Sequence, residues 1–323
     1  MLSSAVHTFS DPDDYADSIR GTDAQLTITG RGTFEANIIR VDLHHLWMQR
    51  LADNLPRVMH LANRAGRLGV AFRTQPGPRL RMAGLEMQQS NIIVCNGDQN
   101  CFQQSDGLAG IGAMSLPAEE MSSIGSVIVG HELILPESST SSAPKASAMA
   151  KLRHLHGAAS HLALRAPEVI EHSESARSLE QALIEAMATC LSTGEVRENR
   201  SALRQHATIM RRFRRAIEEK SDQAIYLPEL CASIGVSERT LRICCQEQLG
   251  LSPKRYLMLR RMHLAHRALR ENASAATTVT EIATRYGFWQ FGRFAGEYRS
   301  IFEELPSATL ARSSEAQQSA CGY

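Results

Sequence analysis

One pattern occurs twice in the last third of the chain, 52 residues apart, and it constrains the fold more than any other feature. The first copy, ELCASIGVS, begins at Glu229, and the second, EIATRYGF, begins at Glu281. Each copy contains a charged, a large apolar and a small residue, followed by a glycine that can adopt the left-handed conformation of a helix end. The pattern predicts two short helices, each followed by a tight turn and a second helix.

The two helix pairs leave distinct packed and exposed faces. The small residues Cys231 and Ala283 fit a pair in which the second helix crosses the first closely. Apolar residues of the second helices are expected to face the core, namely Leu241, Leu249, Phe294, Tyr298 and Ile301. Side chains on the opposite faces are then available to the major groove of DNA, where Arg and Gln read guanine and adenine edges. These candidates are Arg239, Arg242 and Gln246 in the first pair, and Gln290, Phe291 and Arg293 in the second.

The stretch between the two copies, PKRYLMLRRMHLAHRALREN, connects the pairs. Its apolar residues Tyr256, Leu259, Met262, Leu264 and Leu269 predict a helix of about 18 residues, or roughly 27 Å at 1.5 Å per residue. A helix of that length suits two recognition helices held near one turn of DNA apart, ~34 Å. One chain would then contact two adjacent segments of the major groove.

Charge is unevenly distributed along the chain, although the formal net charge is only +1. From Arg200 to Arg312, 19 Lys and Arg residues face 11 Asp and Glu residues, whereas residues 1–199 carry 16 against 22. A basic segment is expected of a domain that neutralises phosphates, and an acidic remainder repels a polyanion. A solvated helical surface explains the charge asymmetry equally well, so the choice between it and a DNA-binding domain depends on the spacing of the motifs.

The segment from Tyr226 to Leu310 resembles the DNA-binding domain of the AraC/XylS family of bacterial transcription regulators. The landmarks of the resemblance are Ser237, Leu241, Gly250, Ser252, Pro253, Tyr256, Arg260, Ala265, Ile282, Ala283, Gly287, Phe288, Phe294, Tyr298 and Pro306. The resemblance implies that this segment binds promoter DNA as double-stranded DNA, and that RNA polymerase is a partner.

Three positions depart from the family pattern. Ile243 stands where many members carry an arginine that reaches DNA, and Cys245 replaces the usual core aromatic residue. Glu303 replaces the glycine that is common before the closing Pro-Ser. The base-reading role implied by the resemblance is therefore carried over to the candidate arginines as hypotheses, and it gives no operator sequence.

Short β-prone runs separated by turn residues occupy residues 20–135. The runs are QLTIT, FEANIIRV, RLGVAFRT, LEMQQSNIIVCN and SVIVGHELILP. Glycine and proline between them mark turns, so the region is predicted to be a mostly β domain, either a small barrel or a sandwich. Members of the AraC/XylS family commonly place a β-rich, cupin-like domain in this position, where it binds a small effector or mediates dimerisation.

The predicted fold class is α+β, with a mostly β N-terminal domain, a helical linker or dimerisation segment, and an all-α domain with two helix-turn-helix units. Residues 137–148, ESSTSSAPKASA, are small and polar and predict a flexible linker. From about Ala148 to Gly194, apolar residues recur at spacings of three and four, which predicts helices that pack on the β domain or pair with a second subunit.

The predicted organisation has four parts. A β-rich sensor or dimerisation domain covers residues 1–135, and a linker and helical region covers 136–200. The DNA-binding domain covers 201–312, and a disordered tail covers 313–323.

Neither a metal nor a cofactor is expected. His44 and His45 lack a carboxylate–histidine spacing, and neighbours on a strand point to opposite faces, so packing or surface roles are favoured over a metal site. The seven cysteines include no CxxC pair and are expected to be reduced and mostly structural, with a redox pair of Cys95 and Cys101 as the alternative. Trp47 and Trp289 are expected to be core aromatic residues, although Trp289 lies close enough to the second recognition helix to touch the DNA backbone.

The remaining features exclude several classes of protein. No run approaches the ~18 apolar residues of a membrane span, and the N-terminus lacks a signal peptide, so the chain is expected in the cytoplasm. Residues 1–199 contain no GxSxG elbow or Gly-flanked cysteine nucleophile, so an enzyme is not expected. The expected function is a transcription activator that responds to a small molecule. The alternative is an effector-independent dimeric regulator or repressor.

Overall fold

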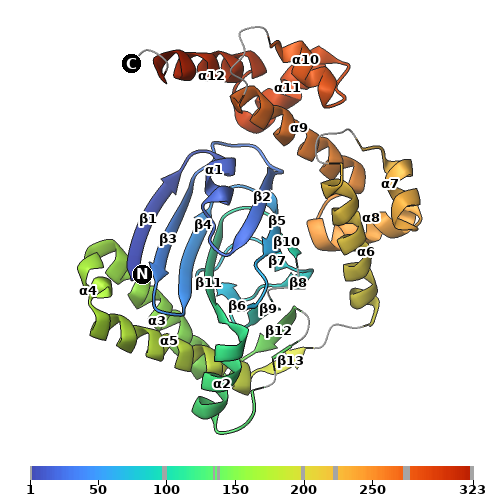
Figure 1. Cartoon of the computed structure of the whole chain (residues 1–323). Coiled ribbons are helices and arrows are strands. Elements are labelled where there is room, and N and C mark those ends of the chain that lie inside the picture. The colour runs from blue at the N-terminus through green and yellow to red at the C-terminus, as the bar shows by residue number, and fades with distance from the viewer. Residues whose placement is uncertain are drawn as a thin grey trace. The chain divides into compact units, whose positions relative to one another are not determined.

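The structure is a computed structural model, and it describes residues 2–96, 100–133, 135–136, 139–197, 201–220, 225–271 and 277–320. The chain divides into two compact units, whose elements are labelled in Figure 1. The first unit comprises Met1–Leu26, Phe34–Asn54 and Met59–Arg204, and the second comprises Thr27–Thr33, Leu55–Val58 and Gln205–Tyr323. Strands dominate the first unit and helices dominate the second.

Two sheets form the β-rich part of the chain. The strands are β1 (Ser3–Phe9), β2 (Thr22–Ile28), β3 (Ala36–Asp42), β4 (Trp47–Asp53), β5 (Arg57–Asn63), β6 (Arg67–Arg73), β7 (Leu80–Met82), β8 (Leu85–Glu86), β9 (Ile92–Asn96), β10 (Cys101–Ser105), β11 (Ala109–Pro117), β12 (Thr140–Ala143) and β13 (Glu195–Arg197). The larger sheet has the order β1-β3-β4-β11-β6-β9-β12-β13, and the smaller has the order β2-β5-β10-β7-β8. In the larger sheet, the central strand β11 pairs antiparallel with both β4 and β6.

The larger sheet has different neighbours on its two faces, because successive side chains of a strand alternate between faces. Leu68, Val70 and Phe72 of β6 belong to a buried hydrophobic core that also contains helix residues. Gly69 and Ala71 of the same strand line a cavity together with residues of the smaller sheet. The sequence of β6 therefore places a close-packed layer on one face and small side chains on the other.

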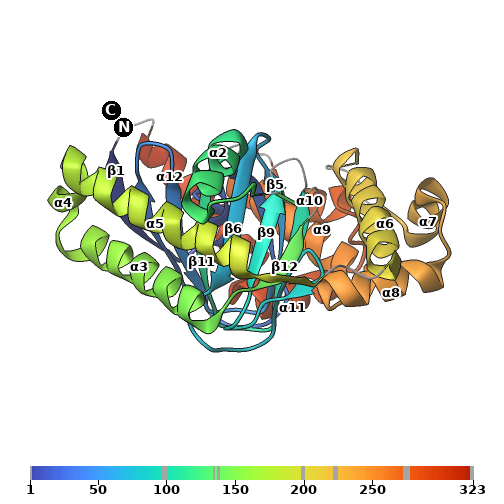
Figure 2. The ribbon, with the colours of Figure 1, turned by 90° about the horizontal axis from the view of Figure 1, so that it is seen from below.

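Three helices complete that hydrophobic core. They are α3 (Ala146–Arg165), α4 (Pro167–Glu171) and α5 (Ser173–Thr193), and Figure 2 shows α3 and α5 lying along the larger sheet. Their buried residues occur at the predicted helical spacing and include Leu152, Ala159, Leu183, Ile184 and Met187. The helices expected from about Ala148 onward are thus present, and they pack on the β domain.

Residues 137–148 are not the flexible linker that their composition predicted. Within the described part of this segment, Thr140–Ala143 forms β12, which pairs with β9 and β13, while residues 137 and 138 lie outside the described residues. Buried Ser141 accepts a hydrogen bond from Asn91 Nδ2 at 2.8 Å through its Oγ. Small hydroxyl side chains are typical of a linker, but here they fill a tight position within a sheet.

Gly194 follows the last residue of α5, as expected, but it does not adopt the left-handed conformation in which a glycine usually ends a helix, because its φ is −81°. A Cβ at this position would lie 1.8 Å from Ser142 Oγ, so only glycine allows the chain to pass this close to β12.

The run SVIVGHELILP was predicted to be a strand, but its first residues belong to a helix. Helix α2 (Ala118–Val129) has acidic residues Glu119 and Glu120 in its first turn and ends at Gly130, whose φ is 76°. Met121 is buried in the hydrophobic core beside the larger sheet, and apolar residues of the following turns of α2 pack against the same core. These tertiary contacts override the β propensity of the Val-Ile-Val run.

Several elements were not predicted, namely α1 (Pro12–Asp17), β1, β4, β5, β7, β10, β11, β12 and β13. Charged residues obscure the alternation in two of them, because Asp53 of β4 and Arg57 of β5 are buried. A binary pattern of apolar and polar residues cannot identify a strand whose inward side chains are charged.

Seven helices are described for the second unit. They are α6 (Ser201–Glu218), α7 (Leu227–Ile234), α8 (Glu238–Leu249), α9 (Pro253–Glu271), α10 (Val279–Arg285), α11 (Phe291–Phe302) and α12 (Pro306–Ala320). Helix α9 has 19 residues, close to the predicted length, and runs between the α6–α8 group and the α10–α12 group (Figure 1). Four of its five predicted core residues are buried, and Leu264 is half-buried.

A buried polar chain connects α9, α11 and α12. His266 Nδ1 lies 2.6 Å from the Tyr298 hydroxyl, which lies 2.7 Å from Thr309 Oγ1. Thr309 donates to Glu304, whose carboxylate also accepts two hydrogen bonds from Arg312 at 2.6 and 2.7 Å. Because Tyr298 is fully buried, these partners satisfy a hydroxyl that would otherwise destabilise the core.

The sequence predicted a disordered tail from residue 313, whereas the structure describes residues up to Ala320 as part of helix α12. Ser313 Oγ donates a hydrogen bond to the Arg270 carbonyl at 2.6 Å. Pro306 suits the first turn of this helix, where its missing N–H needs no partner. Residues 321–323, including Cys321, lie outside the described residues.

The predicted α+β class, a β-rich N-terminal part followed by a helical part with two helix-turn-helix units, is confirmed. None of the helices in the described ranges is long and apolar enough to cross a membrane.

Glu303 provides a test of this fold, because it adopts a left-handed φ of 59° directly after α11. We expect the variant Glu303→Gly to be more stable than Glu303→Ala by about 1 kcal/mol, since both lose the carboxylate but only glycine adopts this φ without steric cost. Chemical denaturation of the two variants measures the difference. Equal stabilities would mean that the left-handed backbone is not retained in solution.

Candidate nucleic-acid interface

The first helix-turn-helix unit consists of α7 and α8, and local signals set its turn. Gly235 ends α7 with a left-handed φ of 70°, as the sequence predicted. Ser237 caps α8, and its Oγ accepts a hydrogen bond from the Thr240 backbone N–H at 3.1 Å. Leu241 and Leu249 are buried, so one face of α8 is fixed against the domain core, as expected.

The opposite face of α8 is a continuous exposed stripe. Arg239, Arg242, Ile243 and Gln246 are all exposed, and their spacing of three and four residues places them on one side of the helix. Three of these residues are the predicted base-reading candidates. Ile243, with half of its surface exposed, adds an aliphatic side chain in the middle of a polar stripe.

The polar side chains of the stripe form only weak interactions with other described residues of the protein, or none. Arg239 has no hydrogen bond or ion pair to any residue that the structure describes, and Arg242 forms an exposed ion pair with Glu238 at 3.3 Å. Gln246 Nε2 donates to the Gly250 carbonyl at 3.1 Å. An exposed i,i+4 ion pair is worth only about 0.3–0.5 kcal/mol, so these side chains can exchange their partners for DNA at little cost.

The second helix-turn-helix unit consists of α10 and α11. Thr278 and Glu281 form a capping box at the start of α10, and the hydrogen bond from the Thr278 backbone N–H is the largest cause that lowers the pKa of the Glu281 carboxyl. Gly287 has a left-handed φ of 76° after α10. Ala283 is fully buried at the helix crossing, as predicted, whereas Cys231 of the first unit is only half-buried.

The exposed surface of the second unit is more aromatic than that of the first. The predicted residues Gln290, Phe291 and Arg293 are exposed at the start of α11, and Arg293 pairs with Glu297 at 2.9 Å. Trp289 was expected in the core, but 70% of its surface is exposed. It precedes α11 by two residues, a position at which the turn points side chains outward rather than into the helix crossing.

Cys244 and Cys245 lie on the packed face of α8, as the sequence suggested. Both are fully buried, and burial raises the pKa of the Cys244 thiol to about 11 and raises that of Cys245 further. Cys245 Sγ lies 3.9 Å from Met210 Sδ, so a methionine of α6 fills the space beside this small residue. Thiols that remain protonated at neutral pH are poor nucleophiles.

His44 and His45 are not on a strand, contrary to the premise of the sequence argument, but in the turn between β3 and β4. His44 Nδ1 lies 3.2 Å from Glu180, and His45 Nδ1 lies 2.8 Å from Glu120. These contacts fasten the turn to α5 and α2. No group of three or more potential metal-ligating side chains is found in the described part of the chain.

Cys95 and Cys101 lie on β9 and β10, in different sheets, and both are buried free thiols. Burial raises the pKa of the Cys95 thiol to about 12. Residues 97–99 of the turn between these strands lie outside the described residues. A buried, protonated thiol is an inert packing group rather than a redox centre.

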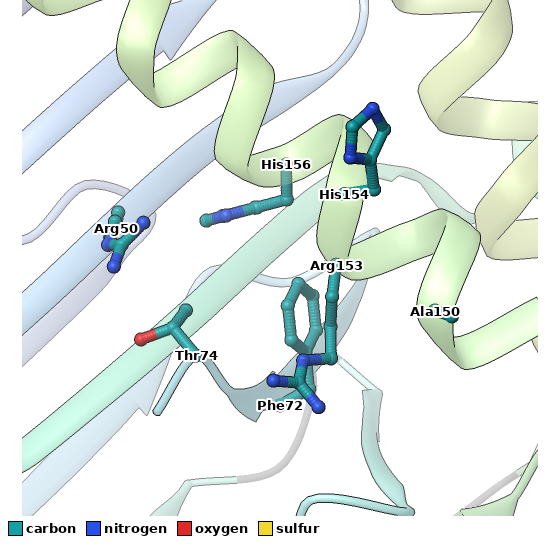
Figure 3. Close-up of a pocket in the computed structure, with 7 residues that line it drawn as sticks. All are labelled: Arg50, Phe72, Thr74, Ala150, Arg153, His154 and His156. Atoms are coloured by element: carbon teal, nitrogen blue, oxygen red, sulfur yellow. The ribbon is translucent and has the colours of Figure 1, made fainter. Parts of the chain in front are cut away.

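A hollow of about 450 Å³ lies between α3 and the larger sheet (Figure 3). Arg50 and Thr74 line it from the strand side, and Arg153 and His156 line it from α3. Burial lowers the pKa of His156 to about 4, so the ring is neutral at pH 7, although the hydrogen bond between its Nε2 and the Gln49 carbonyl at 3.0 Å acts in the opposite direction. Arg50 and Arg153 supply positive charge to this hollow.

A helix-turn-helix domain family matches residues 230–312 of the chain. The probable thc operon regulatory protein of Rhodococcus erythropolis is 39% identical over 94 residues, which is 29% of this chain and 28% of that protein. The XylDLEGF operon transcriptional activator 3 of Pseudomonas putida is 38% identical over 96 residues, which is 30% of this chain and 29% of that protein. The chain thus spans less than a third of the length of these curated relatives.

A solved structure of a probable AraC family transcriptional regulator from Rhodopseudomonas palustris is 34% identical, with a TM-score of 0.30, and the match covers 32% of this chain and 96% of that one. The family match begins within α7 and ends within α12. The C-terminal part of the chain, residues 230–312, is thus a helix-turn-helix domain similar to those of AraC/XylS-type regulators.

Proposed function

We propose that the protein is a sequence-specific DNA-binding regulator of transcription, and that residues 201–312 form its DNA-binding domain. The observation that carries the proposal is the exposed stripe of Arg239, Arg242, Ile243 and Gln246 on the helix that follows a capped tight turn. Such a stripe offers donors to guanine and adenine edges while the buried face of the helix holds it in place.

The regulator acts as an activator in the cytoplasm, with promoter DNA and RNA polymerase as its macromolecular partners. Residues 1–135 serve as the sensor of a small-molecule effector or as a dimerisation surface, and the protein works by binding rather than by catalysis. Similarity to relatives that are transcriptional activators supports this direction of regulation.

Genome-wide chromatin immunoprecipitation of the full chain, followed by binding titrations across a salt series, tests the proposal. We expect discrete peaks that share two motif halves about one helical turn apart, and tighter binding to these fragments than to random DNA at physiological salt. Diffuse occupancy without a shared motif would contradict a sequence-specific regulator. If no metabolite changes DNA affinity or thermal stability, the effector-independent alternative replaces the activator.

Contacts of the arginines with specific bases can be distinguished from a general effect of their positive charge on DNA binding. We expect Arg239→Ala or Arg293→Ala to cost ~1–3 kcal/mol of binding free energy at the selected site, with little change on random DNA, because a base contact carries sequence information. Arg177→Ala, which removes an exposed arginine of α5 in the first unit, is the matched control and should change neither. Equal losses on both DNAs would assign the arginines to phosphate contacts.

Ile243 is predicted to read a thymine methyl group, because it is the one aliphatic side chain in the described stripe of α8. Replacing the contacted thymine by deoxyuridine removes one methyl and should weaken binding about fourfold, given ~0.8 kcal/mol for each buried carbon of this size. In Ile243→Ala the same replacement should have no effect. Band-shift titrations of the four combinations measure the coupling, and an undiminished deoxyuridine effect in the variant would rule out the contact.

A further inference from the structure

The hollow between α3 and the larger sheet has the composition of an anion site (Figure 3). We propose that it binds a small phosphate monoester, whose phosphate group is held by Arg50 and Arg153. The hollow lies on the helix-covered face of the sheet, so it is separate from the cavity between the two sheets. The inference does not rest on the proposed function, because it concerns residues of the first unit alone.

The alternation of side chains along β4 places Arg50 in the hollow. Met48 belongs to the hydrophobic core on the helix-covered face, and Arg50, two residues further along the strand, lies on the same face. Gln49 and Leu51 line the cavity on the opposite face. Arg50 is half-buried, so its guanidinium has lost part of its hydration. A cation at the edge of an apolar core is costly unless a partner compensates its charge.

The register of three strands forms the floor of the hollow. Gly112 of β11 pairs with Arg50 of β4 and with Phe72 of β6, so these residues make one row across the sheet. A Cβ at Gly112 would lie 2.6 Å from the Phe72 ring and 3.1 Å from His156 Cε1. Only glycine therefore leaves room for Phe72 and His156, which pack edge to face with ring centres 5.1 Å apart. Both rings are buried, which closes the hollow on this side.

Neither arginine has a counter-charge within the described part of the chain. Arg50 and Arg153 form no hydrogen bond or ion pair with any residue that the structure describes. Among the described residues that line the hollow, none is acidic. Lys151 of α3 lies outside the hollow and does have such a partner, Glu185 at 2.9 Å. The two half-buried guanidinium groups are thus available to an anion, and arginine binds phosphate through paired, charge-assisted hydrogen bonds.

Thr74 adds a neutral hydrogen-bonding group to the hollow. Its Oγ1 is buried and has no hydrogen-bond partner among the described residues. Gly110 of β11 leaves the room in which this oxygen lies, because a Cβ there would come within 2.8 Å of it. A buried hydroxyl without a partner costs free energy, so a ligand oxygen that accepts its hydrogen bond would remove that cost. One hydroxyl and two guanidinium groups together suit the several acceptor oxygens of a phosphate group.

The charge and the size of the hollow define the class of ligand. Burial lowers the pKa of His156 to about 4, and the charge of Arg50 lowers it further, so this ring adds no positive charge at pH 7. The two arginines match the two negative charges of a phosphate monoester, whose second pKa is about 6. The volume of about 450 Å³ falls within the range of small-molecule sites, ~300–1,000 Å³, and leaves room for an organic group beside the phosphate. Ala150 and His154 are exposed and mark the open edge of the hollow.

Isothermal titration of the full chain at pH 7, in a buffer without phosphate, tests the proposal with phenyl phosphate, phenyl sulfate and inorganic phosphate. The two esters have nearly the same shape, but phenyl sulfate carries one negative charge and phenyl phosphate carries mostly two. We expect phenyl phosphate to bind at least about tenfold more tightly than phenyl sulfate, because only its second charge can neutralise the second guanidinium. We also expect it to bind more tightly than inorganic phosphate, because the phenyl group fills more of the hollow.

Two outcomes of these titrations would overturn the proposal as a whole, namely absence of phenyl phosphate binding and equal affinity for the two esters. Equal affinity for phenyl phosphate and inorganic phosphate would overturn the assignment of an ester, because the free ion would then be the ligand.

Three variants locate the site and one serves as the control. Arg50→Gln and Arg153→Gln should each remove most of the preference for phenyl phosphate over phenyl sulfate. Thr74→Val should weaken phenyl phosphate binding about threefold or more, since it removes one hydrogen-bond donor and keeps the shape of the side chain. Arg165→Gln removes an exposed arginine of α3 that does not line the hollow, and should change no affinity.

Thermal unfolding of each variant without ligand separates binding from a role in the fold. Thr74→Val should be at least as stable as the unmodified chain, because the hydroxyl that it removes has no partner among the described residues. A retained preference for phenyl phosphate in both arginine variants would overturn the proposal, as would loss of the preference in Arg165→Gln. Because no DNA is present, these results are independent of the proposed function.

Discussion

The burial of α9 is the interaction on which the DNA-binding part of the protein depends. Tyr256, Leu259, Met262 and Leu269 are buried along 19 residues of this helix, which packs against α8 of the first helix-turn-helix unit and against α10 of the second. The polar chain through Tyr298 then ties α11 and α12 to the same helix. Two recognition helices held in this way can present their exposed faces to DNA without an ordering cost at each binding event.

The two exposed faces differ in chemistry, and this difference has functional consequences. The first unit presents two arginines and a glutamine around Ile243, whereas the second presents Trp289 and Phe291 beside one arginine. Polar groups discriminate bases through paired hydrogen bonds, while aromatic groups respond to thymine methyls and to the shape of the groove. We therefore expect the first unit to make the larger share of the hydrogen bonds to bases.

Sequence alone identified the C-terminal domain because its signals are local. Gly235, Gly287 and the helical spacing of core residues act within a few positions of the chain, and the structure places them as expected. The exposure of Trp289 escaped the sequence argument because an aromatic residue next to a helix is usually packed. The sequence also missed the strand at Thr140–Ala143, and it predicted a core position for Trp47, which is half-buried beneath the guanidinium groups of Arg20 and Arg67. Both arise from contacts between distant segments, which no local pattern encodes.

The central claim is that one chain reads two adjacent major-groove segments through α8 and α11. Guanine methylation interference on a selected operator tests it most directly, because a methyl group on N7 blocks the approach of an arginine in the major groove. We expect interference at two clusters of guanines whose centres lie about one helical turn, ~10 base pairs, apart. Interference at a single cluster, or at none, would contradict it.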